Sequence, residues 1–120
     1  MGHVFADIEL VNSVDLANSK SGIIGNEEVR IYKLNVMVDT GALMMTINEN
    51  IQEILGLPTV DHRIAQMADG TRMRLPVVGP MEIRFQDRFS VGNAYVLPGN
   101  SKAILGRIPL QEMLATQIKL

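Results

Sequence analysis

The chain of 120 residues contains no cysteine, so disulfide bonds and thiolate metal sites are excluded and the fold needs no oxidising compartment. Aromatic residues are also scarce, at 4% of the sequence, whereas eight methionines are present. We therefore expect flexible methionine side chains to fill gaps in a core that is short of rings. Apolar residues still make up 47% of the chain, which is enough for the core of a single domain spanning residues 1–120.

Strong net charge is lacking too. Charged residues make up 20% of the sequence and the net charge is -2, which gives no electrostatic reason to expect nucleic acid or an anionic membrane as a partner. The first residues lack the basic start and apolar run of a signal peptide, and no uncharged stretch is long and apolar enough to cross a bilayer. We therefore expect a soluble, cytoplasmic protein.

Most of the sequence is patterned like β-strands, with apolar residues alternating or running together and with frequent β-branched residues. Strands are predicted at residues 4–12, 29–38, 81–85, 89–97 and 102–107. Residues 17–28 are rich in Asn, Ser and Gly and predict a loop. Many short strands indicate an all-β fold, and we expect a compact closed β-barrel with one or two short helices.

Two segments carry helix signals. Residues 47–57 have apolar side chains on one face, with Asn48 placed as the cap and Gly56 as the stop. Residues 108–117 carry Pro109 in what would be the first turn of a helix.

Residues 63–75 (RIAQMADGTRMRL) predict a β-hairpin, because Asp69-Gly70 is a favoured two-residue turn of type I′. The turn sets the register, which pairs Ile64 with Leu75, Gln66 with Met73 and Ala68 with Thr71 on one mostly apolar face. The opposite face comprises Ala65, Met67, Arg72 and Arg74. A hairpin with an apolar underside is expected to cover another part of the protein.

Several common functional motifs are absent. His3 and His62 lack a ligand-like spacing, so no metal site is expected. Residues 22–28 (GIIGNEE) do not match a phosphate-binding loop, and no GxSxG serine motif occurs. We therefore expect no cofactor.

The strongest candidate for chemistry is the tripeptide Asp39-Thr40-Gly41, which interrupts an apolar run (VMVDTGALMM, residues 36–45). By itself the tripeptide also suits a tight turn at the surface, because Asp and Gly are turn formers. The apolar flanks favour a dry setting instead, and a buried carboxylate without a partner or a task is costly. We therefore expect Asp39 to be functional.

The segment VMVDTGA resembles the active-site strand and loop of the single-domain, retropepsin-like aspartic proteases, particularly their bacterial members. MADGTRM (residues 67–73) falls where that family has its flap hairpin. AILGR (residues 103–107) resembles the family's segment that crosses behind the active site before a short helix. Order and spacing match over about residues 28–114, whereas the segment before them matches nothing in the family.

The resemblance implies a homodimer, because the chain holds the Asp-Thr-Gly motif once and two-fold symmetry would supply the second carboxylate. The two Asp39 carboxylates would activate a water molecule that hydrolyses a peptide bond of an extended peptide or protein substrate. Thr40 would hydrogen-bond to the other loop. Gly41 would leave room for the substrate backbone, and Ala42 would line the cleft.

The resemblance also assigns roles to two further segments. The hairpin tip would be the flap that closes over substrate, with residues Met67, Ala68, Asp69, Gly70 and Thr71. The segment behind the active site would comprise Ile104, Leu105, Gly106 and Arg107. Residues 4–10 and 116–120 are candidates for strands of a sheet between the two chains.

Viral members of the family usually carry acidic residues soon after the motif, and these pair with an arginine that follows the second glycine motif. Leu43 and Met44 occupy those positions here, so Arg107 lacks that partner. This difference favours one alternative, a catalytically silent dimer that binds peptides or assists assembly. A second alternative is an unrelated β-barrel with Asp39 on a surface turn. The sequence does not specify the substrate, the cleavage preference or the pathway.

Overall fold

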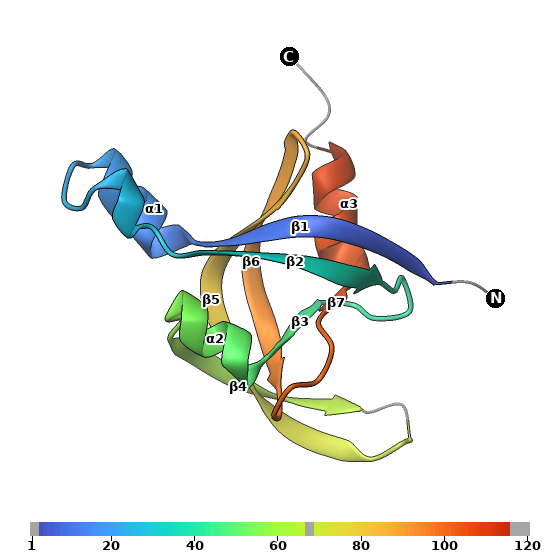
Figure 1. Cartoon of the computed structure of the whole chain (residues 1–120). Helices are drawn as coiled ribbons and strands as arrows, with labels where there is room; N and C mark the ends of the chain where they lie inside the picture. The colour runs from blue at the N-terminus through green and yellow to red at the C-terminus, as the bar shows by residue number, and fades with distance from the viewer. Residues whose placement is uncertain (1–2, 67–68, 116–120) are drawn as a thin grey trace.

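Strands dominate the computed structural model, which describes residues 3–66 and 69–115, and they form one sheet that curls into a ring (Figure 1). The strand order is β1-β2-β7-β3-β6-β5-β4, and β1 also pairs with β5, so β4 lies outside the ring. The strands are β1 (Val4–Asn12), β2 (Ile31–Val38), β3 (Met45–Asn48), β4 (Thr59–Gln66), β5 (Arg72–Phe85), β6 (Arg88–Leu97) and β7 (Ile104–Leu105).

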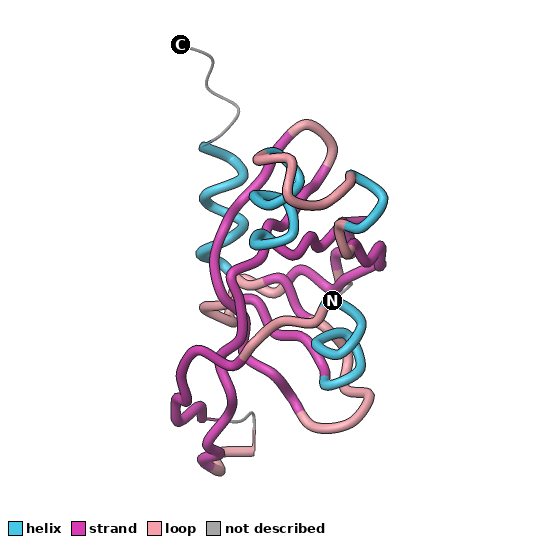
Figure 2. The backbone as a smooth tube through the Cα atoms, turned by 90° about the vertical axis from the view of Figure 1, so that its left-hand side faces the viewer, coloured by secondary structure: helices cyan, strands magenta, loops and turns pink. Residues whose placement is uncertain are grey.

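The helices lie outside this ring. They are α1 (Ser13–Lys20), the short 3₁₀ helix η1 (Asn26–Glu28), α2 (Glu49–Leu55) and α3 (Arg107–Ala115). Figure 2 shows α3 at one end of the molecule and the β4–β5 hairpin projecting at the other. In the described part of the chain, no helix combines the length and the hydrophobicity that a bilayer crossing requires.

The expectation of a mostly β fold is confirmed, but the ring is not a clean barrel. β7 has only two residues, and it pairs parallel with β2 and meets β3 at the single pair Thr46–Ile104. β3 and β6 are also parallel, whereas the other pairs are antiparallel. The ring is thin at β7 because the chain enters this strand from an irregular loop and leaves it at Gly106 for α3.

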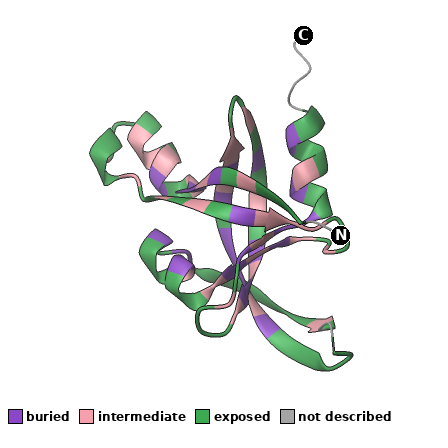
Figure 3. Ribbon diagram, turned by 45° about the vertical axis from the view of Figure 1, so that its right-hand side comes forward, coloured by how far each residue is buried: buried purple, intermediate pink, exposed green. Residues whose placement is uncertain are grey.

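The core fills the interior of the ring, and Figure 3 colours stretches of the ring strands as buried. Every ring strand contributes to it, for example through Leu10, Val36, Ile47, Ile83, Val96 and Leu105. Methionines fill part of this core, as expected from the scarcity of aromatic residues; they are Met45, Met81 and Met113. β4 contributes no buried side chain, since it lies outside the ring.

Both predicted helices are present with slightly different ends. Asn48 caps α2, because its Oδ1 accepts a hydrogen bond from the Ile51 N–H at 2.8 Å, and Gly56 ends the helix with a positive φ of 61°. Pro109 lies in the first turn of α3 and is buried. Residues 116–120 lie outside the described residues, so the terminal strand there stays a prediction.

The predicted loop at residues 17–28 is wrong in part, because it contains the second half of α1 and all of η1. The Oδ1 of Asn12 caps α1 by accepting the Asp15 N–H at 3.0 Å. The composition of this segment favours turns, but the cap and the contacts of Asp15 with the rest of the fold stabilise the helix instead.

The hairpin is present, but its predicted register is wrong by one residue. Gln66 pairs with Arg72 and Ala65 with Met73, so Ala65, and not Ile64, shares a face with Leu75. The carboxylate of Asp69 accepts hydrogen bonds from the Thr71 N–H and hydroxyl at 2.9 and 2.6 Å, which closes the turn locally instead of pairing Thr71 across the hairpin. A slip of one residue reverses the faces of a strand, and Ile64 is accordingly exposed.

An ion pair between the buried carboxylate of Asp15 and the exposed Arg30, which precedes β2, attaches the α1–η1 segment to the ring. The Asp15 carboxylate accepts hydrogen bonds from Arg30 through its backbone N–H at 3.0 Å, Nε at 2.8 Å and Nη2 at 3.0 Å. Beside it, the Nδ2 of buried Asn12 donates to the Leu55 carbonyl at 2.8 Å. The hydrogen bond from the Arg30 side chain holds the pKa of Asp15 below its usual range, although burial opposes this effect.

We predict that Asp15→Asn lowers the free energy of unfolding by about 2 kcal/mol at neutral pH, because the substitution weakens charge-assisted bonds to a buried group. A depressed pKa contributes stability above the unfolded pKa and loses it as the pH falls. The difference between wild type and variant should therefore shrink below pH of about 4. Urea unfolding of both proteins at several pH values measures this difference in the free energy of unfolding. Asp61→Asn, which breaks the exposed Asp61–Arg63 pair, is the control and should change little.

Candidate active site

The loop from Asp39 to Met44, here called the DTG loop, connects β2 with β3 and rests on the chain segment that begins with β7. The Asp39 N–H donates to the Leu105 carbonyl at 3.0 Å, and the Arg107 and Ile108 N–H groups donate to the Ala42 and Leu43 carbonyls at 2.8 and 3.0 Å. Backbone bonds on both sides therefore fix the DTG loop. The structure thus brings together the two segments that the sequence singled out, residues 39–42 and 104–107.

Gly106 permits the closest contact between these segments. A Cβ at this position would lie 2.3 Å from the Met44 carbonyl oxygen and 2.8 Å from the Met44 backbone N and C atoms. These are backbone atoms, so no side-chain rotation would relieve the overlap. Gly106 therefore allows the crossing segment to lie directly behind the DTG loop.

Asp39 itself is less buried than the apolar flanks predict. Its Oδ1 accepts a hydrogen bond from the Gly41 N–H at 2.9 Å, and its carbonyl accepts one from the Ala42 N–H at 3.1 Å. Asp39 is half-buried, and Thr40 and Gly41 are exposed. The expectation of a dry carboxylate is therefore wrong for the single chain, because burial ends in β2 and resumes only at Met45, after the loop.

A cavity of about 430 Å³, here called the DTG cleft, lies between the DTG loop and the β4–β5 hairpin. Its lining residues are Gly41, Ala42, Leu43, Met44, Thr46, Ala65, Gln66, Leu75, Tyr95, Leu97 and Ile104. None of them carries a charge, so the DTG cleft suits uncharged and mainly apolar groups. The hairpin contributes Ala65, Gln66 and Leu75 to the lining of this cleft, and Ala65, predicted on the opposite face, lies on the face of Leu75 because of the observed register.

Three lining residues, Thr46, Tyr95 and Leu97, were not singled out in the sequence, and they meet only because β3 pairs with β6. Leu75 was expected on the apolar face of the hairpin, and it reaches the cleft because β5 pairs with β6. The pairing of Thr46 with Tyr95 joins positions far apart in the chain. Strand periodicity identifies which side chains share a face, but not which strands become neighbours.

The remaining predicted residues are placed as follows. The Arg107 backbone binds the DTG loop, whereas its side chain is exposed and forms no ion pair within the described residues. Leu43, which occupies one of the positions that are acidic in viral members of the family, is also exposed. In the hairpin tip, Gly70 has a positive φ of 87° beside Asp69 and Thr71. Met67 and Ala68 lie outside the described residues.

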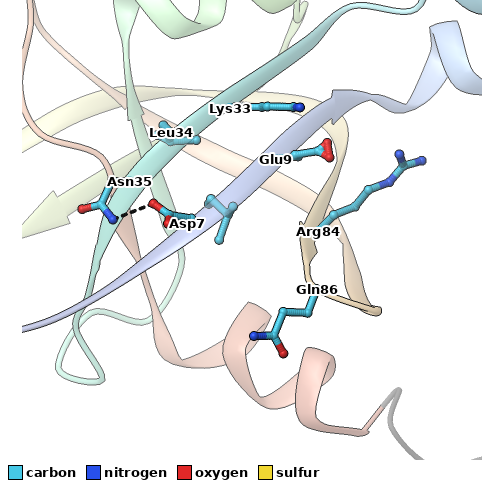
Figure 4. A pocket seen from close by; sticks show the side chains of 8 residues that line it. Asp7, Glu9, Lys33, Leu34, Asn35, Arg84 and Gln86 are labelled. Carbon is cyan, nitrogen blue, oxygen red and sulfur yellow. Dashed lines mark hydrogen bonds between the residues drawn. The ribbon is translucent and has the colours of Figure 1, made fainter.

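A larger cavity, of about 740 Å³, lies elsewhere. Figure 4 shows side chains of β1 and β2 around it, together with Arg84 of the neighbouring strand β5 and Gln86. Glu9 lies opposite Lys33 on β2 and Arg84 on β5, and Asp7 accepts a hydrogen bond from Asn35, so charges of both signs line this cavity. No residue of the DTG loop lines it, and no three acidic or histidine side chains in the described ranges are grouped as metal ligands would be.

An Asp-Thr-Gly loop at the rim of an apolar cleft, backed by an Ile-Leu-Gly-Arg crossing and faced by a hairpin, defines the class of single-lobed acid proteases. The model of one protein family, described as aspartyl protease, matches residues 14–107. The chain therefore belongs to the aspartyl protease family, and the retropepsin-like resemblance is confirmed. The match also includes residues 14–27, which had resembled nothing. No curated protein matches the chain.

We predict that Gly106→Ala lowers the free energy of unfolding by about 2–3 kcal/mol, because the added methyl group overlaps the Met44 backbone. Gly92→Ala is a matched control, since a Cβ there meets no atom within 4 Å. Denaturant unfolding of both variants measures the difference. Equal midpoints for the two variants would show that the crossing tolerates a side chain.

Proposed function

We propose that the protein is a homodimeric aspartic endopeptidase in which the Asp39 carboxylates of two chains activate a water molecule that attacks a peptide bond. The observation that carries this proposal is the rigidly held DTG loop, whose carboxylate and threonine stay accessible in the single chain. Membership of the aspartyl protease family supports the hydrolase class. An isologous dimer supplies two such loops from one sequence.

Two carboxylates a few ångströms apart do not both ionise easily, so they share one proton. The ionised Asp39 acts as general base towards the water molecule. The protonated Asp39 polarises the scissile carbonyl and then passes its proton to the leaving nitrogen. The cycle thus needs one proton on the pair, neither none nor two.

The rest of the loop has supporting roles in this proposal. Thr40, which is exposed in the single chain, hydrogen-bonds to the loop of the other copy and aligns the carboxylates. The bond from the Gly41 N–H to Oδ1 orients the Asp39 side chain. The hairpin tip, residues 67–71, closes over an extended peptide, and apolar substrate side chains occupy the DTG cleft.

A silent dimer that binds peptides without cleaving them is the second candidate. The observation that favours this candidate is that Arg107 and Leu43 are both exposed. An acidic residue at position 43 could form an ion pair with Arg107 and connect the DTG loop to residues 104–107, and leucine cannot. The two candidates differ in one measurement, since both bind peptide but only the protease produces new termini.

We predict that Asp39→Asn lowers peptide cleavage by at least about 100-fold, because the pair loses its general base. The variant should fold normally, since Asn has nearly the same shape. A mixed peptide library analysed by mass spectrometry at several pH values detects the loss, and Asp87→Asn, which changes an exposed carboxylate on another turn, serves as the control. Cleavage by a rigorously purified Asp39→Asn protein would refute the catalytic role.

A mixing experiment tests whether the site belongs to the dimer. When wild type is mixed with excess Asp39→Asn protein and subunits exchange, most wild-type chains pair with a variant chain. Such a dimer keeps the packing contacts but has one carboxylate, so activity per wild-type chain should fall towards the small fraction of wild-type pairs. Native mass spectrometry of tagged chains demonstrates the exchange. Constant activity per wild-type chain after proven exchange would refute the shared site.

A further inference from the structure

β4 is the last strand of the sheet, and within the described residues no strand pairs with its outer side, which is here called the β4 edge. Figures 1 and 3 show β4 above β5 in the hairpin, on the side of the ring and of the DTG loop. Ala65 and Gln66, at the end of β4, also line the DTG cleft. A peptide in the cleft therefore lies beside the β4 edge where it passes the hairpin.

The alternation of the β4–β5 ladder decides which backbone groups of β4 face this edge. In an antiparallel pair of strands, every second residue pair exchanges hydrogen bonds, and the residues between turn their N–H and C=O groups outward. His62 lies opposite Pro76, which has no N–H, so this pair does not exchange hydrogen bonds. In steps of two from His62, Ile64 and Gln66 also turn their backbone groups towards the β4 edge.

The three outward N–H groups differ in what they bind. The Asp61 Oδ1 accepts the His62 N–H at 2.7 Å, and the Asp61 Oδ2 accepts the Arg63 Nε–H at 2.9 Å. In the described part of the chain, no side chain accepts a hydrogen bond from the N–H of Ile64 or Gln66. The β4 edge is therefore open next to the DTG cleft and occupied by a carboxylate further from it.

The Asp61 carboxylate blocks strand addition in two ways. It takes the N–H that a peptide carbonyl would need at His62, and its negative charge repels the carbonyl oxygen of an approaching strand. The hydrogen bond from the His62 N–H, together with the Arg63 side chain, holds the pKa of Asp61 below its usual range. The carboxylate is therefore ionised from mildly acidic to neutral pH.

We propose that Asp61 is a specificity-determining residue that ends the pairing of a bound peptide with the β4 edge at Ile64. The inference rests on the proposed function, because it concerns the peptide in the DTG cleft. The peptide backbone pairs with Gln66 and Ile64 by strand addition, and the peptide residues beyond them meet the occupied N–H of His62. Recognition through the backbone thus covers a segment of limited length.

Three variants separate the occupied N–H from charge. Asp61→Ala removes both oxygens and frees the His62 N–H, and it leaves no hole in the core because Asp61 is exposed. Asp61→Asn keeps a neutral oxygen that accepts the same N–H and should retain the block. Asp87→Ala removes an exposed carboxylate from the turn between β5 and β6 and is the control for net charge.

The first measurement needs no substrate. Amide hydrogen exchange of the full-length protein is followed residue by residue by NMR and corrected for the intrinsic rate of each sequence. Exchange at His62 should be about threefold faster or more in Asp61→Ala, the effect of losing one exposed hydrogen bond, and close to wild type in Asp61→Asn. Equal exchange at His62 in wild type and Asp61→Ala would show that its N–H is not held and would refute the block.

The second measurement determines how long a peptide segment is recognised. A peptide that wild type cleaves is lengthened by one alanine at a time at both ends, since a two-fold dimer offers one β4 edge to each end. KM should fall with length and then become constant. In Asp61→Ala the constant value should be reached about two residues later at each end, because outward backbone groups recur every two residues, and should be about fivefold lower.

The controls decide what causes such a shift. Asp61→Asn and Asp87→Ala should reach a constant KM at the wild-type length. The same limiting length for wild type and Asp61→Ala would overturn the inference. A shift of equal size in Asp87→Ala would assign the effect to net charge and would overturn it as well.

The failure of the proposed function gives a different result. If wild type cleaves no peptide, the protease proposal is wrong, and the dissociation constants of statine-containing peptides of the same lengths replace KM. The limiting length for binding should again be about two residues greater at each end in Asp61→Ala. Equal limiting lengths would overturn the role of Asp61, and so would the absence of binding at every length, because the β4 edge then pairs with no peptide.

Discussion

The backbone of residues 104–108 passes directly behind the DTG loop, and the geometry of the whole site depends on this contact. Three N–H···O=C bonds and the absence of a side chain at Gly106 hold Asp39–Met44 against it. The same crossing completes the ring of strands, since β7 lies between β2 and β3. The segment that closes the ring of strands is therefore also the segment that positions the Asp39 carboxylate, so a substitution that displaces it affects both the fold and the site.

Two asparagine side chains each cap a helix and also donate a hydrogen bond to a distant segment of the chain. Asn12 caps α1 and donates to the Leu55 carbonyl, and Asn48 caps α2 and donates to the Ser101 carbonyl. An amide has both an acceptor and a donor, so one residue satisfies a helix end and binds a distant segment. At Asn12 this hydrogen bond connects α1 to the end of α2, whereas at Asn48 it connects the start of α2 to the loop between β6 and β7.

Much of the fold was predictable because local rules agree with the tertiary structure. Asn48 and Gly56 delimit α2 by capping chemistry that acts within one turn, and Asp39-Thr40-Gly41 together with Ile104–Arg107 were recognisable as a pair. The register of the hairpin was not predicted correctly, because the hydrogen bonds from Thr71 to the Asp69 carboxylate compete with a two-residue turn. α1 was also missed, since its stability depends on Asn12 and on the ion pair of Asp15 with distant Arg30.

The sequence alone determined the class of the protein, the position of its carboxylate motif and the largely apolar β-strands, because these depend on residue identity and on short-range periodicity. Only the tertiary structure decided the exposure of Asp39 and the lining of the DTG cleft. Those features depend on which strands become neighbours, as when β3 brings Thr46 beside Tyr95 of β6. Strand order results from packing of the whole core, and no local pattern encodes it.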